Sequence, residues 1–575
     1  MMEDQSTTLS RDGSSKVQVE AFSIDDHEQA IPHRSPRLPP RRLKQRHIAG
    51  TLGTGLFLGS GQALSGAGPL GALIAYSLVG TVAYSSLCSL GEMTSLAPVP
   101  GSFPYYAARW VDPALGFAVG SRSSWIWPRV TVPVELSGVQ LLTQFYYNDG
   151  GDTMSCDTTN NTTVIQNPAT THPDISYPVT VATWVAACII NIFGARCVAR
   201  LLVSSLPRVP RSPCAVTLII GLIITGLVID LGGAPTKDRL GFRYWKNPGV
   251  FARAHLIQHN VDLDRFLGVV SVIVQAAFSF QGMEIAAIAA SETESPRRNI
   301  AKAIRKSFFR ILIFYILGIF VAGLIVPSNN LLLLQPFQST TFASAAVSPY
   351  VIAMKCVSMR VLPQVVNAGF ITSAFSAGNS FLFAASRILF GLALQKQAPS
   401  FFLKTKNGVP IVAVLFTASF GLLSLLGMSQ QPQQVFQWFV YLTTVGDFFS
   451  WATINLTYIF FYRGLKQQGK DRKELQYWCR FQPWLSIWGV VWCTIFILIS
   501  GFQVFWRFNA SDFLSAYINI PIFIGLYLLW KLTKKTEIWT PEEMDFDTGI
   551  PTLEETELPY RKPHGFWGKF ADAVF

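Results

Sequence analysis

The chain has 575 residues, of which 50% are hydrophobic, 13% aromatic and only 14% charged. A soluble domain carries about 25% charged residues, so this composition argues against a string of soluble domains and against a disordered protein. Apolar runs of about 20 residues recur along the sequence, each long enough to cross the hydrocarbon core of a bilayer. We therefore expect one all-α polytopic membrane protein embedded in lipid.

The composition also argues against several kinds of partner. The formal net charge is +12, but the cations gather in particular loops between apolar runs, so nucleic acid is not the expected partner. The eight cysteines form no C-x-x-C pair and the seven histidines are dispersed, so we expect neither a metal site nor a disulfide framework. No nucleophile elbow, kinase signature or phosphate loop is present. We expect no enzyme and no cofactor.

Twelve candidate transmembrane helices follow one another along the chain. A polar tail of residues 1–46, expected to be disordered, precedes the membrane domain of residues 47–533, and a polar tail of residues 534–575 follows it. Both tails are expected to be solvated and poorly folded. The expected spans are residues 48–67, 70–96, 115–146, 178–195, 214–231, 266–290, 311–327, 362–390, 409–427, 434–462, 484–505 and 513–532.

Lysine and arginine predict the orientation of these spans. The N-terminal tail and the loops after the fourth, sixth and tenth spans are rich in cations, whereas the loop at 147–177 has none; the basic loop at 232–265 is the contrary case. The positive-inside rule therefore predicts that both termini are cytoplasmic. The Asn-x-Ser/Thr sequons at Asn160, Asn161 and Asn509 then fall in outward loops and are candidate glycosylation sites.

Glycine interrupts the first expected span. The segment from Ile48 to Gly61 has glycines at 50, 53, 55, 59 and 61, and each costs a helix about 1 kcal/mol relative to alanine. In transporters, helices broken in this way offer N–H groups to an anion and carbonyls to a cation, an arrangement that suits a zwitterionic amino acid. The alternative is a packing face at which small residues let two helices approach closely.

The sixth expected span places glycine and a carboxylate together at membrane depth. It reads Phe278-Ser-Phe-Gln-Gly-Met-Glu284. A charged glutamate costs at least about 2.5 kcal/mol there, so Glu284 is a candidate for proton coupling or gating. The alternative is a glutamate that only fixes helix packing through a hydrogen bond. Glu135 is a weaker candidate for the same role. The first and sixth expected spans are both interrupted and lie five spans apart. An inverted repeat of five helices would place two interrupted helices at this spacing.

Several blocks of the sequence resemble the fungal amino-acid permeases of the yeast amino-acid transporter family, within the amino acid–polyamine–organocation superfamily. The likeness runs from about residue 42 to the C-terminal tail. The blocks are Gly50-Thr-Leu-Gly-Thr-Gly-Leu-Phe, Gly91-Glu-Met, Pro100-Gly-Ser-Phe-Pro-Tyr-Tyr-Ala, Phe280-Gln-Gly-Met-Glu and Ser376-Ala-Gly-Asn-Ser-Phe-Leu-Phe-Ala-Ala-Ser-Arg.

This resemblance implies a LeuT-like fold, with spans 1–5 and 6–10 as inverted repeats, two added helices, and discontinuous helices 1 and 6. It implies proton-coupled amino-acid uptake by alternating access at the plasma membrane, with protons and amino acids as partners and the proton gradient as driving force. It does not predict an oligomeric state or the choice of amino acid. The residues that it assigns to substrate binding are Thr51, Gly53, Thr54, Gly55, Phe278, Ser279, Phe280 and Gly282.

The sequence departs from the family pattern in a few places. The inner half of the first span is short, arginines interrupt residues 120–129, three prolines fill residues 197–214 where the fifth span begins, and 149–176 looks like an Asn/Thr-rich insertion. A locally wrong reading frame would produce such abrupt changes. Two alternatives to a transporter therefore stay open: a non-transporting amino-acid sensor of the same fold, which usually has a longer N-terminal extension, and an inactive product of a defective gene model.

Overall fold

The computed structural model describes twelve stretches of the chain, all within the unit Leu38–Phe575. Within them the regular secondary structure is helical, apart from one isolated β-bridge between Lys406 and Val409. The predicted all-α class is thus confirmed for these stretches, whereas Met1–Arg37 and the rest of the N-terminal tail lie outside them. The described stretches are 53–99, 102–122, 127–148, 176–203, 214–284, 295–330, 333, 348–359, 361–394, 397–406, 409–428 and 432–552.

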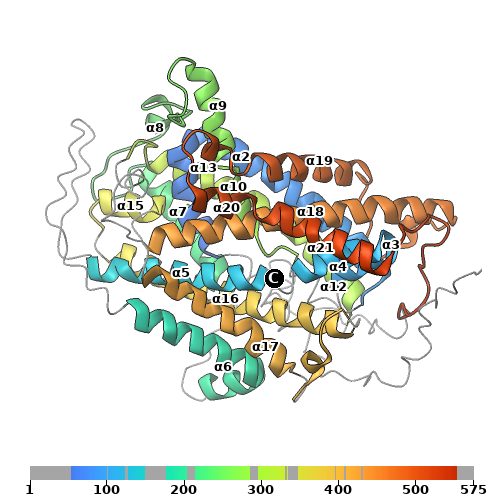
Figure 1. The fold of residues 1–575 in the computed structure, drawn as a ribbon. Helices are drawn as coiled ribbons and strands as arrows, with labels where there is room; N and C mark the ends of the chain where they lie inside the picture. Colours follow the sequence, from blue (N-terminus) through green and yellow to red (C-terminus); the bar gives the residue numbers. More distant parts are fainter. Residues whose placement is uncertain are drawn as a thin grey trace, which may run out of the picture. The chain divides into compact units, whose positions relative to one another are not determined.

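The helices follow the expected spans in chain order (Figure 1). The first group is α2 (Thr54–Leu96), α3 (Ser102–Trp110), α4 (Pro113–Ser121), α5 (Trp127–Asn148), α6 (Ser176–Val203), α7 (Cys214–Asp230), α8 (Arg243–Lys246), α9 (Val261–Ser271) and α10 (Ile273–Phe280). The second group is α12 (Pro296–Arg310), the π-helix η3 (Ile311–Ile316), α13 (Leu317–Ile325), α15 (Pro349–Cys356), α16 (Leu362–Leu394), η5 (Ser400–Leu403), α17 (Ile411–Ser419), η6 (Phe420–Met428), α18 (Pro432–Gln467), η7 (Arg472–Glu474), α19 (Trp484–Ile499), η8 (Phe502–Phe505), α20 (Ala510–Tyr517) and α21 (Asn519–Lys534).

Length and hydropathy identify fewer membrane crossings than the twelve expected from the sequence. Among the described residues, 5 helices are long and apolar enough to cross a membrane, or 6 if α20 and α21, bent by 44°, form one span. Three shorter apolar helices, at Tyr177–Phe193, Thr217–Asp230 and Ile411–Gly427, coincide with the fourth, fifth and ninth expected spans. The structure therefore supports a polytopic helical membrane protein, and the count of twelve spans stays a prediction.

The first two expected spans join in a single element, α2, with a kink at Gly68. Its φ of 77° lies in the left-handed region, which glycine adopts without steric cost. The kink frees backbone groups that the extended segment at 250–252 satisfies, because Leu70 N donates to Val250 O and Ala252 N donates to Ala67 O, each at 3.0 Å. A loop far along the sequence thus holds the first pair of spans in place.

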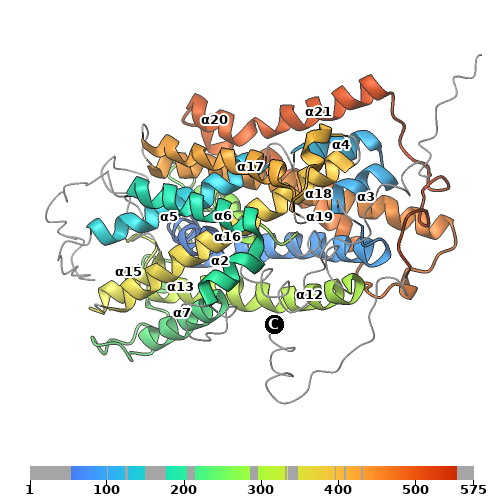
Figure 2. The same ribbon diagram turned by 90° about the horizontal axis from the view of Figure 1, so that it is seen from below.

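Helix α2 contacts α10, α13, α18 and α19, while α5 contacts α16 and α18 (Figures 1 and 2). Buried side chains from these elements form the main hydrophobic core, with Phe57, Phe280 and Trp451 among its largest members. Helices from the two halves of the sequence therefore share one core, with α2, α10 and α18 at the place where the candidate site is expected.

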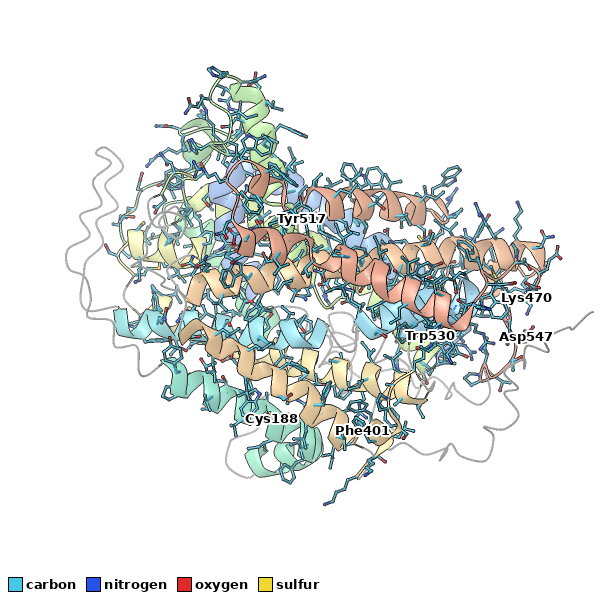
Figure 3. All side chains as sticks on the ribbon, viewed as in Figure 1. Cys188, Phe401, Lys470, Tyr517, Trp530 and Asp547 are labelled. Carbon is cyan, nitrogen blue, oxygen red and sulfur yellow. The ribbon has the colours of Figure 1, made fainter. Side chains whose placement is uncertain are left out.

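The segment 536–552, called here the C-terminal strap, packs against the helices. Met544 and Phe546 are each only 2% exposed, and Lys470 Nζ pairs with Asp547 Oδ1 at 2.6 Å (Figure 3). The expectation of a solvated, poorly folded tail is wrong for this part, because two apolar side chains in a polar stretch find a packing site. Residues 553–575 lie outside the described residues.

The unusual patches of the sequence lie largely outside the described residues. The third expected span is described as α4, which ends at Ser121, and α5, which begins at Trp127; residues 123–126 lie outside the described residues. Helix α6 is described to Val203 and α7 from Cys214, and the three prolines lie outside the described residues. The insertion 149–176 lies outside the described residues except for its last position.

One cysteine corrects an expectation from the sequence. Cys356, the last residue of α15, is disulfide-bonded, although the scattered cysteines predicted no disulfide. Spacing along the sequence does not reveal a pair that only the fold brings together. Disulfides persist in oxidising compartments, and Cys356 follows the seventh expected span, on the side predicted to face outward.

Candidate functional site

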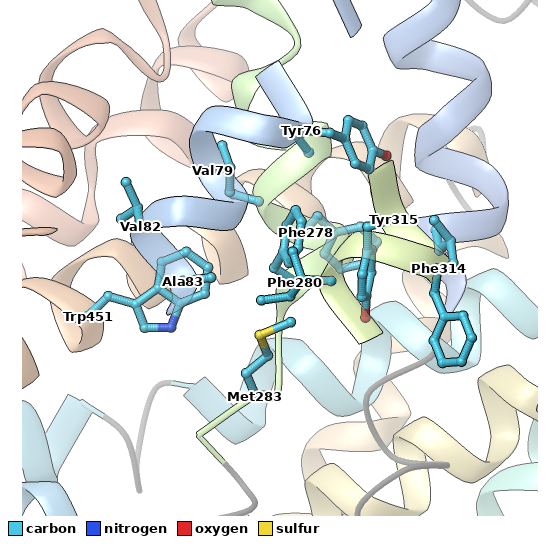
Figure 4. Close-up of a cluster of buried hydrophobic side chains, with 14 of the residues drawn as sticks. Tyr76, Val79, Val82, Ala83, Phe278, Phe280, Met283, Phe314, Tyr315 and Trp451 are labelled. Atoms are coloured by element: carbon cyan, nitrogen blue, oxygen red, sulfur yellow. The ribbon is translucent and has the colours of Figure 1, made fainter. Parts of the chain in front are cut away.

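The sixth expected span is broken where the sequence predicts it. Helix α10 ends at Phe280, and Gln281 leaves the helix with φ −54° and ψ 143°. Gly282 follows with a φ of +85°, a left-handed value that favours glycine. Figure 4 shows that the chain has left the helix at Met283. Helix α10 therefore ends inside the sixth expected span, and the described residues 281–284 are not helical; a discontinuous helix 6 stays a prediction, because residues 285–290 lie outside the described residues.

Helix α2 begins at Thr54, inside the glycine-rich segment, with Gly53 as its N-cap. The backbone N–H of Thr54 donates to Glu135 Oε2 at 3.2 Å. A Cβ added at Gly53 would overlap the Glu135 carboxylate, so glycine is what lets this acid reach the helix terminus. The α2 N-terminus is thus occupied by an internal carboxylate. Thr51 lies outside the described residues.

Helices α2 and α10 are in backbone contact at Gly55. A Cβ at this position would lie 2.7 Å from Phe278 O and 2.8 Å from Ser279 Cα. One turn later, a Cβ at Gly59 would lie 3.4 Å from Gln275 O. The glycine-rich segment is therefore both a helix terminus and a packing face, so the two interpretations of its glycines hold together.

The three predicted side chains of the sixth span lie in different surroundings (Figure 4). Phe278 makes an edge-to-face contact with Phe436 of α18. The Ser279 hydroxyl lies 2.9 Å from the hydroxyl of Tyr76 on α2. Phe280 is fully buried and stacks on Tyr315, with ring centroids 4.4 Å apart. Phe278 and Ser279 therefore face neighbouring helices near the break, whereas Phe280 packs into the aromatic core.

Glu284 follows the break and is buried, with 5% of its surface exposed. Trp451 Nε1 of α18 donates to Glu284 Oε2 at 3.5 Å. The predicted carboxylate is therefore buried and contacts α18. Tyr76 and Trp451 are polar contacts that sequence reasoning missed, because an aromatic residue inside an apolar span gives no signal of the partner it will meet.

The arrangement brings opposite helix ends together. The first turn of α2 carries N–H groups without intrahelical partners, and the last turn of α10 carries carbonyls without them. A helix N-terminus favours an anion and a C-terminus favours a cation. Because Gly55 lies against Phe278, these two termini meet at one place, which is chemically suited to a small molecule with a carboxylate and an ammonium group.

The predicted glycosylation sites are only partly described. Asn509 is the N-cap of α20, and its side chain accepts from Ser511 N at 3.0 Å while the residue stays exposed. Asn160 and Asn161 lie outside the described residues. Glycosylation at all three stays a prediction.

Comparison with known proteins places these features in a family. Residues 45–540 match the model of the amino acid permease family. The chain belongs to this family. A lysine/arginine permease of Candida albicans is 34% identical over 96% of this chain and 91% of its own length. A dicarboxylic amino acid permease of Saccharomyces cerevisiae is 32% identical over 94% and 84%, and a proline-specific permease of Emericella nidulans is 35% identical over 90% and 88%.

These relatives of the amino acid permease family confirm the resemblance found in the sequence. Together with the apolar helices, they make the chain an integral membrane protein of a transporter family. The match runs through residues 120–129 and 197–214 as well as through the span breaks, so neither a sensor nor an inactive product is favoured.

Proposed function

We propose that this chain takes up amino acids across the plasma membrane, coupled to protons, by alternating access. In this proposal twelve helices form a LeuT-like fold with inverted repeats of five, helices 1 and 6 are discontinuous, and both termini are cytoplasmic. The proton gradient supplies the driving force, and no cofactor takes part.

The meeting of the α2 N-terminus with the broken end of α10 carries the proposal. The substrate carboxylate would bind the N–H groups at Thr54 and Gly55, and its ammonium group would bind carbonyls at the end of α10. Both helix ends supply fixed dipoles at membrane depth, where they interact strongly because water does not screen them. Phe278, beside Phe436, would cover the substrate during transport.

Two buried carboxylates support proton coupling. Glu135 accepts the Thr54 N–H and so takes the position that a substrate carboxylate needs. A proton on Glu135 would weaken that hydrogen bond, since a neutral carboxyl accepts less strongly than a carboxylate, and would free the donor. Glu284 would take a proton from the acidic outer side and release it inside as the helices rearrange.

The substrate class is open across the family. The three relatives are named for lysine and arginine, for dicarboxylic amino acids and for proline, which are cationic, anionic and neutral. We therefore propose an amino acid recognised through its α-carboxylate and α-ammonium groups, with side-chain preference set outside these contacts.

Radiolabelled uptake in permease-deficient yeast tests the proposal. Lysine, glutamate and proline would be offered at external pH 5 and pH 7, with and without a protonophore. We expect uptake of at least one of them, faster at pH 5 and abolished by the protonophore. Substrate binding by purified protein without uptake would indicate a sensor, and neither binding nor uptake by a correctly localised protein would indicate an inactive chain.

A further inference from the structure

Arg122 is a cation buried inside the helix bundle. It follows the last residue of α4, and its side chain is only 1% exposed. The sequence gives it no role, because an arginine at membrane depth departs from the family pattern. A guanidinium without counter-charges is costly in such a place, so its surroundings need a physical explanation.

Helix α18 forms the surface against which Arg122 lies. Its Nη1 donates to Ser450 Oγ at 2.9 Å. A Cβ at Gly446 would overlap the guanidinium, so the group rests directly on the α18 backbone at this glycine. Asp447, 2% exposed, is the next residue of the same helix turn. The turn that receives the cation therefore also carries an acid.

Glu284 belongs to the same surroundings. It is held by Trp451, which directly follows Ser450 on α18. Because Ser450 contacts Arg122 and Trp451 contacts Glu284, the guanidinium and this carboxylate lie at adjacent residues of α18, one turn from Asp447. These positions bring both acids within electrostatic range of Arg122. Among the described residues, these three groups thus form one buried cluster with two acids and one cation.

We propose that Arg122 neutralises Asp447 and so leaves Glu284 as the uncompensated carboxylate of this cluster, which binds and releases the coupling proton. The cluster carries a net charge of −1 when Glu284 is ionised and zero when a proton is bound to its carboxylate. Arg122 is then a positioning residue for coupling. This inference rests on the proposed transport function and adds the group that sets when Glu284 is protonated.

Opposite effects of two single substitutions test this assignment. In Asp447→Asn, Arg122 pairs with Glu284 and favours its ionised form, so the pH midpoint of uptake moves to lower pH. In Arg122→Gln, Asp447 and Glu284 repel each other, so the midpoint moves to higher pH. A shift of one pH unit changes the protonated fraction by up to about tenfold. The double variant Arg122→Gln/Asp447→Asn restores the net charge of −1 and the midpoint of the original chain.

A matched pair provides the control. Arg265 and Asp262 form an exposed ion pair at 3.2 Å, and exposed pairs contribute little. The same Arg→Gln and Asp→Asn changes there should leave the midpoint in place. Surface abundance, measured with a fluorescent tag, separates loss of protein from loss of coupling. A purely structural role for Arg122 would lower abundance in both single variants without moving their midpoints, and that result overturns the assignment.

The readout also separates this inference from the proposed function. If the original chain is abundant yet takes up no amino acid, the proposed transport fails. The cluster is then tested by the thermal unfolding of purified protein as a function of pH. There the single variants should move the pH dependence in opposite directions and the double variant should restore it. The same dependence of unfolding on pH in all variants would contradict the claim that Arg122, Asp447 and Glu284 interact.

Discussion

Replacing Gly55 with alanine tests the contact on which the candidate site depends. The added Cβ would lie 2.7 Å from Phe278 O, about 0.7 Å closer than the lower limit of ordinary van der Waals contact at 3.4 Å. The atoms it meets belong to the α10 backbone, so no side chain can rotate away. The two helices must separate at the point where their termini meet.

The cost of this separation follows from overpacking. Extra methyl groups in a filled core cost about 1–3 kcal/mol, which corresponds to about 5- to 150-fold in an equilibrium constant. We expect Gly55→Ala to lower the affinity for the transported amino acid by a factor in this range. Gly59→Ala, one turn later and with its new Cβ 3.4 Å from Gln275 O, should lose less than about threefold.

The assay compares initial uptake rates over a range of substrate concentrations, normalised to surface abundance. Thermal unfolding of the two purified variants reports whether the strain appears as lost stability instead of lost affinity. If Gly55→Ala transports with the same Michaelis constant and unfolds at the same temperature as the original chain, then α2 and α10 do not meet as described.

Further predictions concern one acid of the proposed site and two contacts made by residues between the second and third expected spans. Glu284→Gln should abolish the dependence of uptake on external pH, and undiminished pH dependence would refute its coupling role. Burial alone would raise the pKa of Asp112, but hydrogen bonds from Lys531 and its neighbours outweigh burial and hold the pKa below its ordinary value. Its ionisation therefore stabilises the fold at neutral pH, and this stability is lost as pH falls below about 4. We expect the unfolding temperature of Asp112→Asn to fall less at acid pH than that of the original chain. An equal fall in both proteins would contradict this. Arg109→Ala removes an ion pair at 3.0 Å to the C-terminal strap, residues 536–552, and should make the strap sensitive to limited proteolysis; equal protection in both proteins would show that the contact does not hold it.

Local breaks were predictable from the sequence because their causes are local. Glycine at position 282 supplies the left-handed backbone conformation that follows the end of α10. The glycine-rich start of α2 follows the same logic. A reader of the sequence alone therefore finds where the helices stop, and the intramembrane Glu284 beside one of those stops.

Contacts between distant segments were not predictable. Glu135 reaches the N–H of Thr54 across 81 residues, and Arg122 meets Ser450 across 328 residues. Neither spacing leaves a periodic signal in the sequence. Nothing in the sequence therefore indicates that Arg122 will lie near acidic residues. The C-terminal strap shows the same limit, since Met544 and Phe546 become buried by packing directly against α18 at Gly464.

Transport by the purified chain in proteoliposomes tests the central claim most directly. With an acidic exterior and a neutral interior, radiolabelled lysine, glutamate and proline would be supplied outside in turn. We predict that at least one accumulates above its external concentration and leaks back when a protonophore collapses the gradient. Levels equal to those in protein-free liposomes for all three, with correctly folded and inserted protein, would contradict the account.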